Sequence, residues 1–339
     1  MVARIGIDLG GTKIEGLLMD AQGVPLRRTR VPTPQGDYAG TLRATVDLIR
    51  ALETESASHQ TEKGALPSVG VGMPGSVSTV TGAMKNCNST CLNGRHFRRD
   101  LSDALGRPVA IANDADCFAL SEAVDGAGAH QRRIFGAILG TGVGGGLVES
   151  GTVLQGPNGL CGEWGHNLLP AEGRALDAPP RPCFCGRQDC VETYLSGPGL
   201  SRTHRILSGE EADSEEIGRR ASAGDDTVRQ TLDLYIRQLA FGLSQIINFL
   251  DPEVIVLGGG VSNIARLYDP EDGVPGQWDL WVTSDAVETS LRQAQHGDSS
   301  GVRGAAWLSE QLSSNQPSEP EMGLNQNHEA LERWPGRSR

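Results

Sequence analysis

IGIDLGGTKIEGLLMD at residues 5–20 and FGAILGTGVGGGLVES at residues 135–150 are two versions of one pattern. Each has an apolar strand, a glycine turn and a second apolar strand, which predicts a β-hairpin whose backbone amides can approach an anion. The repeat therefore predicts a duplicated fold with a phosphate loop in each half. At an offset of 130 the copies agree at Gly6/Gly136, Leu9/Leu139, Gly10/Gly140, Gly16/Gly146 and Leu17/Leu147.

The two copies differ in their polar residues. The first carries Asp8, Thr12 and Lys13, and the second carries GTGVGGG at 140–146. We interpret the first loop as one for a metal–phosphate complex, in which Asp8 holds Mg²⁺ through water and Lys13 neutralises charge. We interpret the second loop as one for bare phosphate. An ordinary hairpin turn is the alternative for both.

Composition limits the class of protein. A chain of 339 residues predicts two domains, and its net charge of −12 argues against nucleic acid as a partner. No apolar run approaches the ~20 residues of a membrane span, and the chain begins with no secretory signal. Seven cysteines, three of them between 183 and 190, suit the reducing cytoplasm better than a disulfide framework.

Strand and helix patterns alternate along the chain, which predicts an α/β fold. The polar, proline-containing stretch 313–339 predicts a disordered tail. We expect strands at 4–9, 14–19, 68–72, 109–112, 134–139, 145–149 and 253–257, and helices at 38–57, 97–105, 115–124, 191–207, 213–222 and 226–250.

Two segments follow strands, where ligands of α/β sheets bind. Asn113 and Asp114 follow the strand at 109–112, so Asp114 is a candidate catalytic carboxylate and Asn113 a group that orients a hydroxyl. The alternative is an Asx turn or a helix cap, a role that Asp116 fits better. The strand VIVL ends in Gly258, Gly259 and Gly260, which predicts a platform for adenine or, alternatively, a simple turn.

A cluster of potential metal ligands follows the second hairpin. His166, Cys183, Cys185 and Cys190 have the spacing H-x16-C-x-C-x4-C and supply a complete tetrahedral set for structural Zn²⁺. The alternative is three free cysteines in a turn. Glu163 and Glu192 flank this loop, where carboxylates on a rigid support can accept hydrogen bonds from sugar hydroxyls. Ordinary surface charge is the alternative for both.

Together these motifs resemble the ROK family of bacterial sugar kinases and sugar-responsive regulators. A narrower resemblance, to the fructokinases of that family, covers about residues 4–310 and includes PTP at 32–34 and HGDSSGVRGAAWL at 296–308. The family motifs are DLGGTK at 8–13, ND at 113–114, GTGVGGG at 140–146, EWGH at 163–166, CFCGRQDCVET at 183–193 and VIVLGGG at 254–260.

The resemblance implies a duplicated, actin-like (ribonuclease H-like) two-domain fold with ATP in the interdomain cleft. It implies that Asp114 is the catalytic base and that hexose contacts come from Asn113, Asp114, Glu163, His166 and Glu192. It also implies zinc ligation by His166, Cys183, Cys185 and Cys190. The ATP contacts are expected from Asp8, Gly10, Gly11, Thr12, Lys13, Gly140, Thr141, Gly142, Gly258, Gly259 and Gly260.

We therefore expect an ATP-dependent hexose kinase that converts D-fructose to fructose 6-phosphate, with Mg²⁺ and structural Zn²⁺, and that forms a homodimer. Residues 1–114 with about 296–312 form the expected small domain, and 115–295 form the large one. Kinases for mannose, glucose or N-acetylglucosamine are alternatives. A sugar-sensing regulator is another, although only seven residues precede Asp8 and leave no room for a DNA-binding segment.

Overall fold

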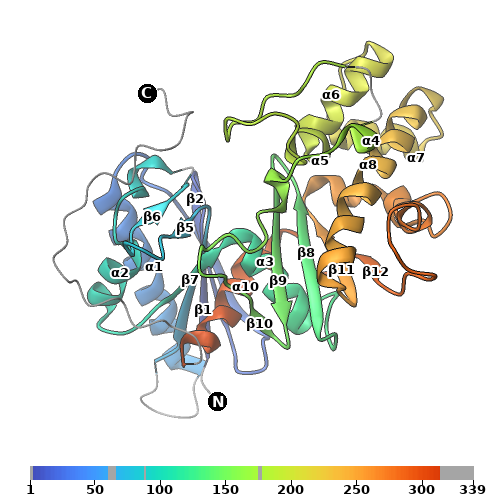
Figure 1. Ribbon diagram of the computed structural model, residues 1–339. Helices are drawn as coiled ribbons and strands as arrows, with labels where there is room; N and C mark the ends of the chain where they lie inside the picture. Colours follow the sequence, from blue (N-terminus) through green and yellow to red (C-terminus); the bar gives the residue numbers. More distant parts are fainter. Residues whose placement is uncertain (1–2, 60–65, 88, 175–177, 314–339) are drawn as a thin grey trace.

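The computed structural model describes residues 3–59, 66–87, 89–174 and 178–313, and it has two lobes, each built on a five-stranded sheet (Figure 1). The first sheet has the strand order β3-β2-β1-β4-β7, and the second has the order β10-β9-β8-β11-β12. In both, an antiparallel hairpin is followed by two parallel strands. This equivalence confirms the predicted α/β class and the duplicated, actin-like fold.

The strands of the first sheet are β1 (Arg4–Leu9), β2 (Lys13–Met19), β3 (Pro25–Pro32), β4 (Ser68–Met73) and β7 (Ala110–Asn113). Those of the second are β8 (Arg133–Leu139), β9 (Val143–Glu149), β10 (Thr152–Val153), β11 (Val254–Gly258) and β12 (Ser290–Gln293). A small hairpin, β5 (Ser76–Val77) with β6 (Met84–Lys85), joins the first lobe. The sequence did not predict β3, because its edge position leaves all of its side chains exposed or half-buried.

The helices are α1 (Tyr38–His59), α2 (Phe97–Leu105), α3 (Asp114–Asp125), α4 (Ala171–Arg174), α5 (Glu192–Leu195), α6 (Gly197–Ser208), α7 (Ser214–Ser222), α8 (Asp226–Leu250), α9 (Pro275–Trp278) and α10 (Ser300–Leu308). The prediction of one helix over 191–207 is wrong. Ser196 is extended, with ψ 164°, and its side chain caps a new helix by accepting from the Gly199 amide. Pro198 then occupies the first turn, where its missing N–H costs nothing.

Helices α3 and α10 each pack against the sheet of the other lobe. Helix α3 follows β7 but lies on β8 and β9, whereas α10 follows β12 but lies on β1 and β4. The glycines shared by the two hairpins explain this close packing. A Cβ on Gly6 would overlap the Val302 carbonyl oxygen, and a Cβ on Gly136 would lie 2.8 Å from that of Ala119. The two crossing helices therefore connect the lobes.

The two hairpins differ by one residue in their loops. Gly6 of β1 pairs with Leu17, whereas Gly136 of β8 pairs with Gly146. The matches Gly16/Gly146 and Leu17/Leu147 in the aligned sequences are therefore not equivalent in the sheets. One extra residue in the first loop, which holds Thr12 and Lys13, accounts for the shift and gives the two loops different shapes.

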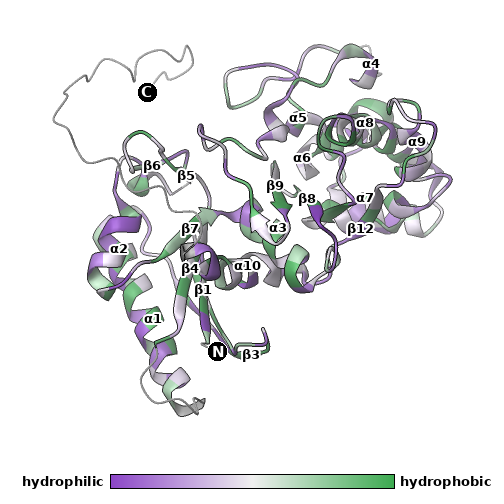
Figure 2. Ribbon diagram, turned by 60° about the horizontal axis from the view of Figure 1, so that its bottom comes forward, coloured by the Kyte–Doolittle hydropathy of each residue, from purple (hydrophilic) through white to green (hydrophobic). Residues whose placement is uncertain are grey.

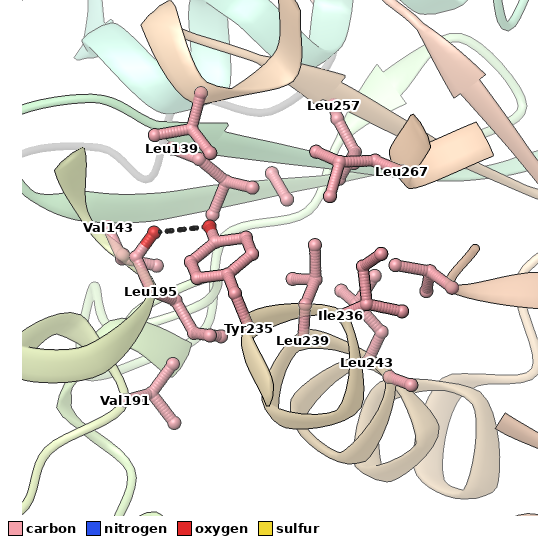
Figure 3. Packing of buried hydrophobic residues seen from close by; sticks show 14 of the residues in the cluster. Leu139, Val143, Val191, Leu195, Tyr235, Ile236, Leu239, Leu243, Leu257 and Leu267 are labelled. Carbon is pink, nitrogen blue, oxygen red and sulfur yellow. Dashed lines mark hydrogen bonds between the residues drawn. The ribbon is translucent and has the colours of Figure 1, made fainter. Parts of the chain in front are cut away.

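The hydrophobic core of the larger lobe forms between α8 and the second sheet (Figure 3). Tyr235 of α8 is fully buried there, and its hydroxyl donates to the Leu195 carbonyl at 2.7 Å. In Figure 2, α1 of the smaller lobe carries both hydrophilic and hydrophobic patches, as expected for a helix that covers one face of a sheet. Each lobe therefore has its own cluster of buried hydrophobic side chains beside its sheet.

The sequence predicts a disordered tail over residues 313–339. Ser313 instead ends a 3-10 turn (Ser309–Ser313), and 314–339 lie outside the described residues. Across the described ranges, no helix combines the length and hydropathy that a membrane crossing needs. The expected domain boundaries, at 114 and about 296, remain a prediction.

Candidate active site

The first glycine loop joins β1 to β2 and is held from behind. The Gly10 amide donates to the Lys13 carbonyl at 3.0 Å, which closes the turn. Thr33 fixes both ends of the loop, because its amide donates to the Thr12 carbonyl and its hydroxyl donates to the Gly10 carbonyl. Gly11, Thr12 and Lys13 are exposed. The result is an anchored loop that presents a hydroxyl and an ammonium group to solvent.

Asp8 lies at the end of β1, directly across from Glu15 of β2. Burial, followed by the charges of Asp114 and Glu15, raises the pKa of Asp8 to about 6. Arg28 and Arg30 both pair with Glu15, which is buried. A carboxyl group among other carboxyl groups favours a bound cation, so the residues around Asp8 fit a hard divalent ion such as Mg²⁺.

The structure brings the second and third glycine segments together. Gly259 has φ +82°, and a Cβ there would lie 2.5 Å from the Leu139 carbonyl oxygen and 3.0 Å from the Gly140 nitrogen. Gly260 faces open space, whereas Gly258 packs on the ring of Phe118. Thr141, between Gly140 and Gly142, is exposed. Close packing thus explains why Gly258 and Gly259 carry no side chain, and Gly259 and Gly260 are both exposed.

Helix α3 begins where the sequence places the catalytic carboxylate. Asn113 is its N-cap, since its side-chain oxygen accepts from the Ala115 amide, and its side-chain amide donates to the Gly75 carbonyl. The expectation that Asp116 is the cap is therefore wrong: Asp116 is the third residue of the helix. Asp114 is exposed, yet enough protein surrounds it that burial raises its pKa.

The four predicted zinc ligands lie together. One ligand atom from each of His166, Cys183, Cys185 and Cys190 lies within 4.8 Å of all the others. The Cys185 and Cys190 sulfurs are 3.6 Å apart, as are the Cys183 sulfur and His166 Nδ1. A tetrahedron with zinc–sulfur bonds of ~2.3 Å places its sulfurs about 3.8 Å apart, so this donor set fits Zn²⁺.

The segment with Glu163 and His166 is fixed to β9. Gly162 and Gly165 approach the β9 backbone so closely that a Cβ on either would overlap a carbonyl group. Trp164 between them is buried, and its indole N–H donates to the Gly144 carbonyl at 2.9 Å. Glu163 is exposed. The expected sugar ligands Glu163 and His166 thus lie in a turn that packs directly against β9, the strand that follows the second glycine loop.

Glu192 connects the cysteine loop to that hairpin. Its Oε2 atom accepts from the Val143 amide at 3.0 Å, and its Oε1 atom lies 3.9 Å from the Cys183 sulfur. Sequence reasoning missed this supporting contact, and it also missed Glu15 with its two arginines. The contact between Glu15 and its arginines could have been found from the pairing of β2 with β3, which places Glu15 and Arg30 opposite each other.

Comparison with known proteins agrees with this site. A sequence model of the ROK family matches residues 4–312, so the chain belongs to the ROK family. It is a sugar kinase of that family, and its fold matches the ROK hexokinase of Thermus thermophilus. That match has a TM-score of 0.76 and 30% identity, and it covers 91% of this chain and 97% of the other.

Relatives whose names give a particular sugar include N-acetyl-D-glucosamine kinases. Those of Haemophilus influenzae and Mannheimia succiniciproducens are 38% and 40% identical over 307 residues, which is 89% of this chain and 98% of each relative. A ROK glucokinase of Streptomyces griseus, solved with glucose and AMPPNP, has a TM-score of 0.69 and 25% identity, with 91% and 99% coverage. These names do not support the narrower resemblance to fructokinases.

Proposed function

We propose that this chain transfers the terminal phosphoryl group of ATP to a hydroxyl of N-acetyl-D-glucosamine. The observation that supports this most is its identity of 36–40% to N-acetyl-D-glucosamine kinases along nearly their whole length. D-fructose, the substrate expected from the sequence, has no such support. N-acetylglucosamine is among the alternatives that the sequence leaves open.

Asp114 is the residue that we assign as general base. It is exposed at the N-terminus of α3, and its charge acts on Asp8, beside which the phosphates are expected. As the sugar oxygen forms its bond to the γ-phosphorus and the bond to ADP breaks, Asp114 accepts the hydroxyl proton. Mg²⁺ at Asp8 supplies charge neutralisation at the phosphates when it is bound.

The glycine segments supply the contacts to ATP in this proposal. Their backbones approach without side chains, which suits the phosphates and the flat adenine. Lys13 adds a positive charge and Thr12 a hydroxyl at the edge of the first loop. The residues assigned to ATP are Gly10, Gly11, Thr12, Lys13, Gly140, Thr141, Gly142, Gly258, Gly259 and Gly260.

Sugar contacts are assigned to residues on both lobes. Glu163 is exposed beside β9 and is the carboxylate that we assign to direct hydroxyl contacts. Asn113 and Glu192 already hold structural partners, but an amide and a carboxylate each have further donor or acceptor capacity. His166 has its Nδ1 atom near a thiol. Its Nε2 atom is the one that we assign to the sugar.

We assign the four-residue cluster to a structural zinc ion, which organises the loop when it is bound. The cluster supplies four ligands, so no position stays open for catalysis. Loop geometry supports the assignment, because the Cys183 amide donates to the Arg187 carbonyl and a bridge pairs Leu168 with Cys190. The loop would therefore hold His166 and Glu192 in fixed positions.

A coupled kinase assay over a hexose panel tests the substrate. We expect the highest kcat/KM for N-acetyl-D-glucosamine, with lower values for N-acetylmannosamine, glucose, mannose and fructose. A preference for fructose would restore the original expectation and overturn this one. Sugar binding without phosphorylation of any hexose would instead identify a sensor. The homodimer remains a prediction that sedimentation velocity can test.

A further inference from the structure

Asp116 has an unusual position for an acidic residue. It is the third residue of α3, and the helix packs there so closely on β9 that a Cβ on Gly146 would lie 3.0 Å from the Asp116 Cα atom. The backbone N–H of Asn113 favours the charged form of this carboxyl group. Its Oδ1 atom is buried and has no hydrogen-bond partner in the part of the chain that the structure describes.

A buried carboxylate oxygen without a donor is costly, because the charged form loses water and gains nothing in exchange. A protonated carboxyl group avoids the cost of burying a charge. The neighbours of Asp116 increase the preference for the neutral form. They are the carboxyl groups of Asp114 on the same helix and Glu163 from the turn beside β9, whose charges oppose a further negative charge. The neighbouring thiols of Cys117 and Cys161, whose pKa values burial raises, supply no positive charge that would stabilise the ionised form.

Two carboxyl groups in one helix turn do not ionise equally when their environments differ. Asp114 is exposed, and its Oδ1 atom accepts from the Ala115 amide at 2.9 Å, where the helix N-terminus favours an anion. Only the backbone N–H of Asn113 favours the charged form of Asp116, and the buried Oδ1 atom has no hydrogen-bond partner among the described residues. The proton therefore belongs on Asp116.

We propose that Asp116 is a positioning residue that keeps its proton below neutral pH and there leaves Asp114 as the only ionised carboxylate at the start of α3. This inference rests on the proposed role of Asp114. Burial, and then the charges of Asp114 and Glu163, raise the pKa of Asp116 to about 7, in agreement with the geometry. Ionisation of Asp116 would add negative charge next to the base and to the incoming phosphates.

Carbon-13 NMR of the full chain, labelled at the aspartate carboxyl carbons, tests the protonation state directly. We expect one resonance with a midpoint near 7 that is absent in Asp116→Asn, separate from that of Asp8 near 6. In Asp114→Asn the midpoint of this resonance should fall, because a neighbouring charge is gone. The proposal is overturned if no aspartate titrates near 7, or if the one that does persists in Asp116→Asn.

The pH profile of kcat gives the second measurement. In the wild type we expect kcat to fall at least about threefold as pH rises through 7, because the new charge opposes the transferred phosphoryl group. Asp116→Asn, which has the shape of the neutral acid, should lack this step. A wild-type step that remains in Asp116→Asn contradicts the proposal. If no hexose is phosphorylated at all, the proposed function fails, whereas the NMR titration still decides the state of Asp116.

Discussion

Glu192 Oε2 accepts the backbone N–H of Val143 at 3.0 Å, and this contact ties the cysteine loop to the first residue of β9. A Cβ on Gly142 would lie 2.6 Å from the same oxygen, so the glycine loop and the carboxylate are in direct contact. The other oxygen of Glu192 lies near Cys183. One side chain therefore couples the proposed phosphate loop to the proposed zinc site.

Replacing Glu192 should affect both substrates. In Glu192→Ala, the Val143 amide loses its acceptor, and we expect kcat/KM for ATP and for the sugar to fall about 10–100-fold, as is typical when a residue that orients metal ligands is lost. Glu172→Gln, an exposed glutamate on α4, is the control and should retain full activity. Unchanged steady-state kinetics in Glu192→Ala would show that the contact has no functional role.

Zinc should be present at about one ion per chain when the protein is purified without a chelator. Cys185→Ser removes one of four ligands, so we expect loss of the metal by elemental analysis, together with a lower Tm and lower activity. Cys91→Ser is the matched control, because Cys91 is half-buried and lies outside the cluster. A metal-free protein that remains fully folded and active would contradict the assignment.

The crossing of α3 and α10 should tolerate no added volume. A Cβ on Gly304 of α10 would overlap the carbonyl oxygen of Cys117 on α3. We expect Gly304→Ala to destabilise the protein by about 1–3 kcal/mol or more, because both backbones must move apart. Gly156→Ala, which has open space around it, is the control in the same denaturant titration. Equal midpoints for the two variants would show that the helices can separate freely.

Local patterns could be predicted from the sequence, whereas contacts between distant segments could not. The hairpins, the start of α3 and the cysteine cluster follow from glycine turns, strand ends and ligand spacing. Helices α3 and α10 each pack on the sheet of the other lobe, and this arrangement depends on close packing at Gly6 and Gly136. The sequence shows that both hairpins have a glycine at this position, but it does not show that a helix packs against it. The state of Asp116 depends on burial that one sequence does not reveal.

The stability of the junction between the lobes should depend on pH through His296. Its Nε2 atom lies 2.9 Å from Asp125 Oδ1, and this hydrogen bond raises the pKa of His296. Because the pKa of His296 is higher in the folded than in the unfolded protein, its protonation stabilises the fold fully at pH values below the unfolded-state pKa of about 6.5. This stabilisation is lost as pH rises through the folded-state pKa. We therefore expect the difference in free energy of unfolding between wild type and His296→Gln to shrink from pH 6 to pH 8.

His130→Gln provides the control for that measurement, since His130 lies outside this contact and the pH dependence should match that of the wild type. The pKa of Asp125 is lowered by His296 and by Arg303, so its own contribution disappears only at acidic pH. A difference between wild type and His296→Gln that stays constant from pH 6 to pH 8 would mean that the histidine does not titrate in this range.

Asp114→Asn is the sharpest test of the chemistry. The substitution keeps the shape of the side chain at the start of α3 but removes the group that accepts the proton. We expect kcat to fall roughly 10²–10⁴-fold, the usual contribution of general base catalysis, while the sugar still binds in isothermal titration calorimetry. Asp103→Asn, an exposed aspartate on α2, should leave kcat unchanged. A variant that loses sugar binding and keeps its kcat would instead make Asp114 a binding residue, because only ground-state affinity would then depend on its charge.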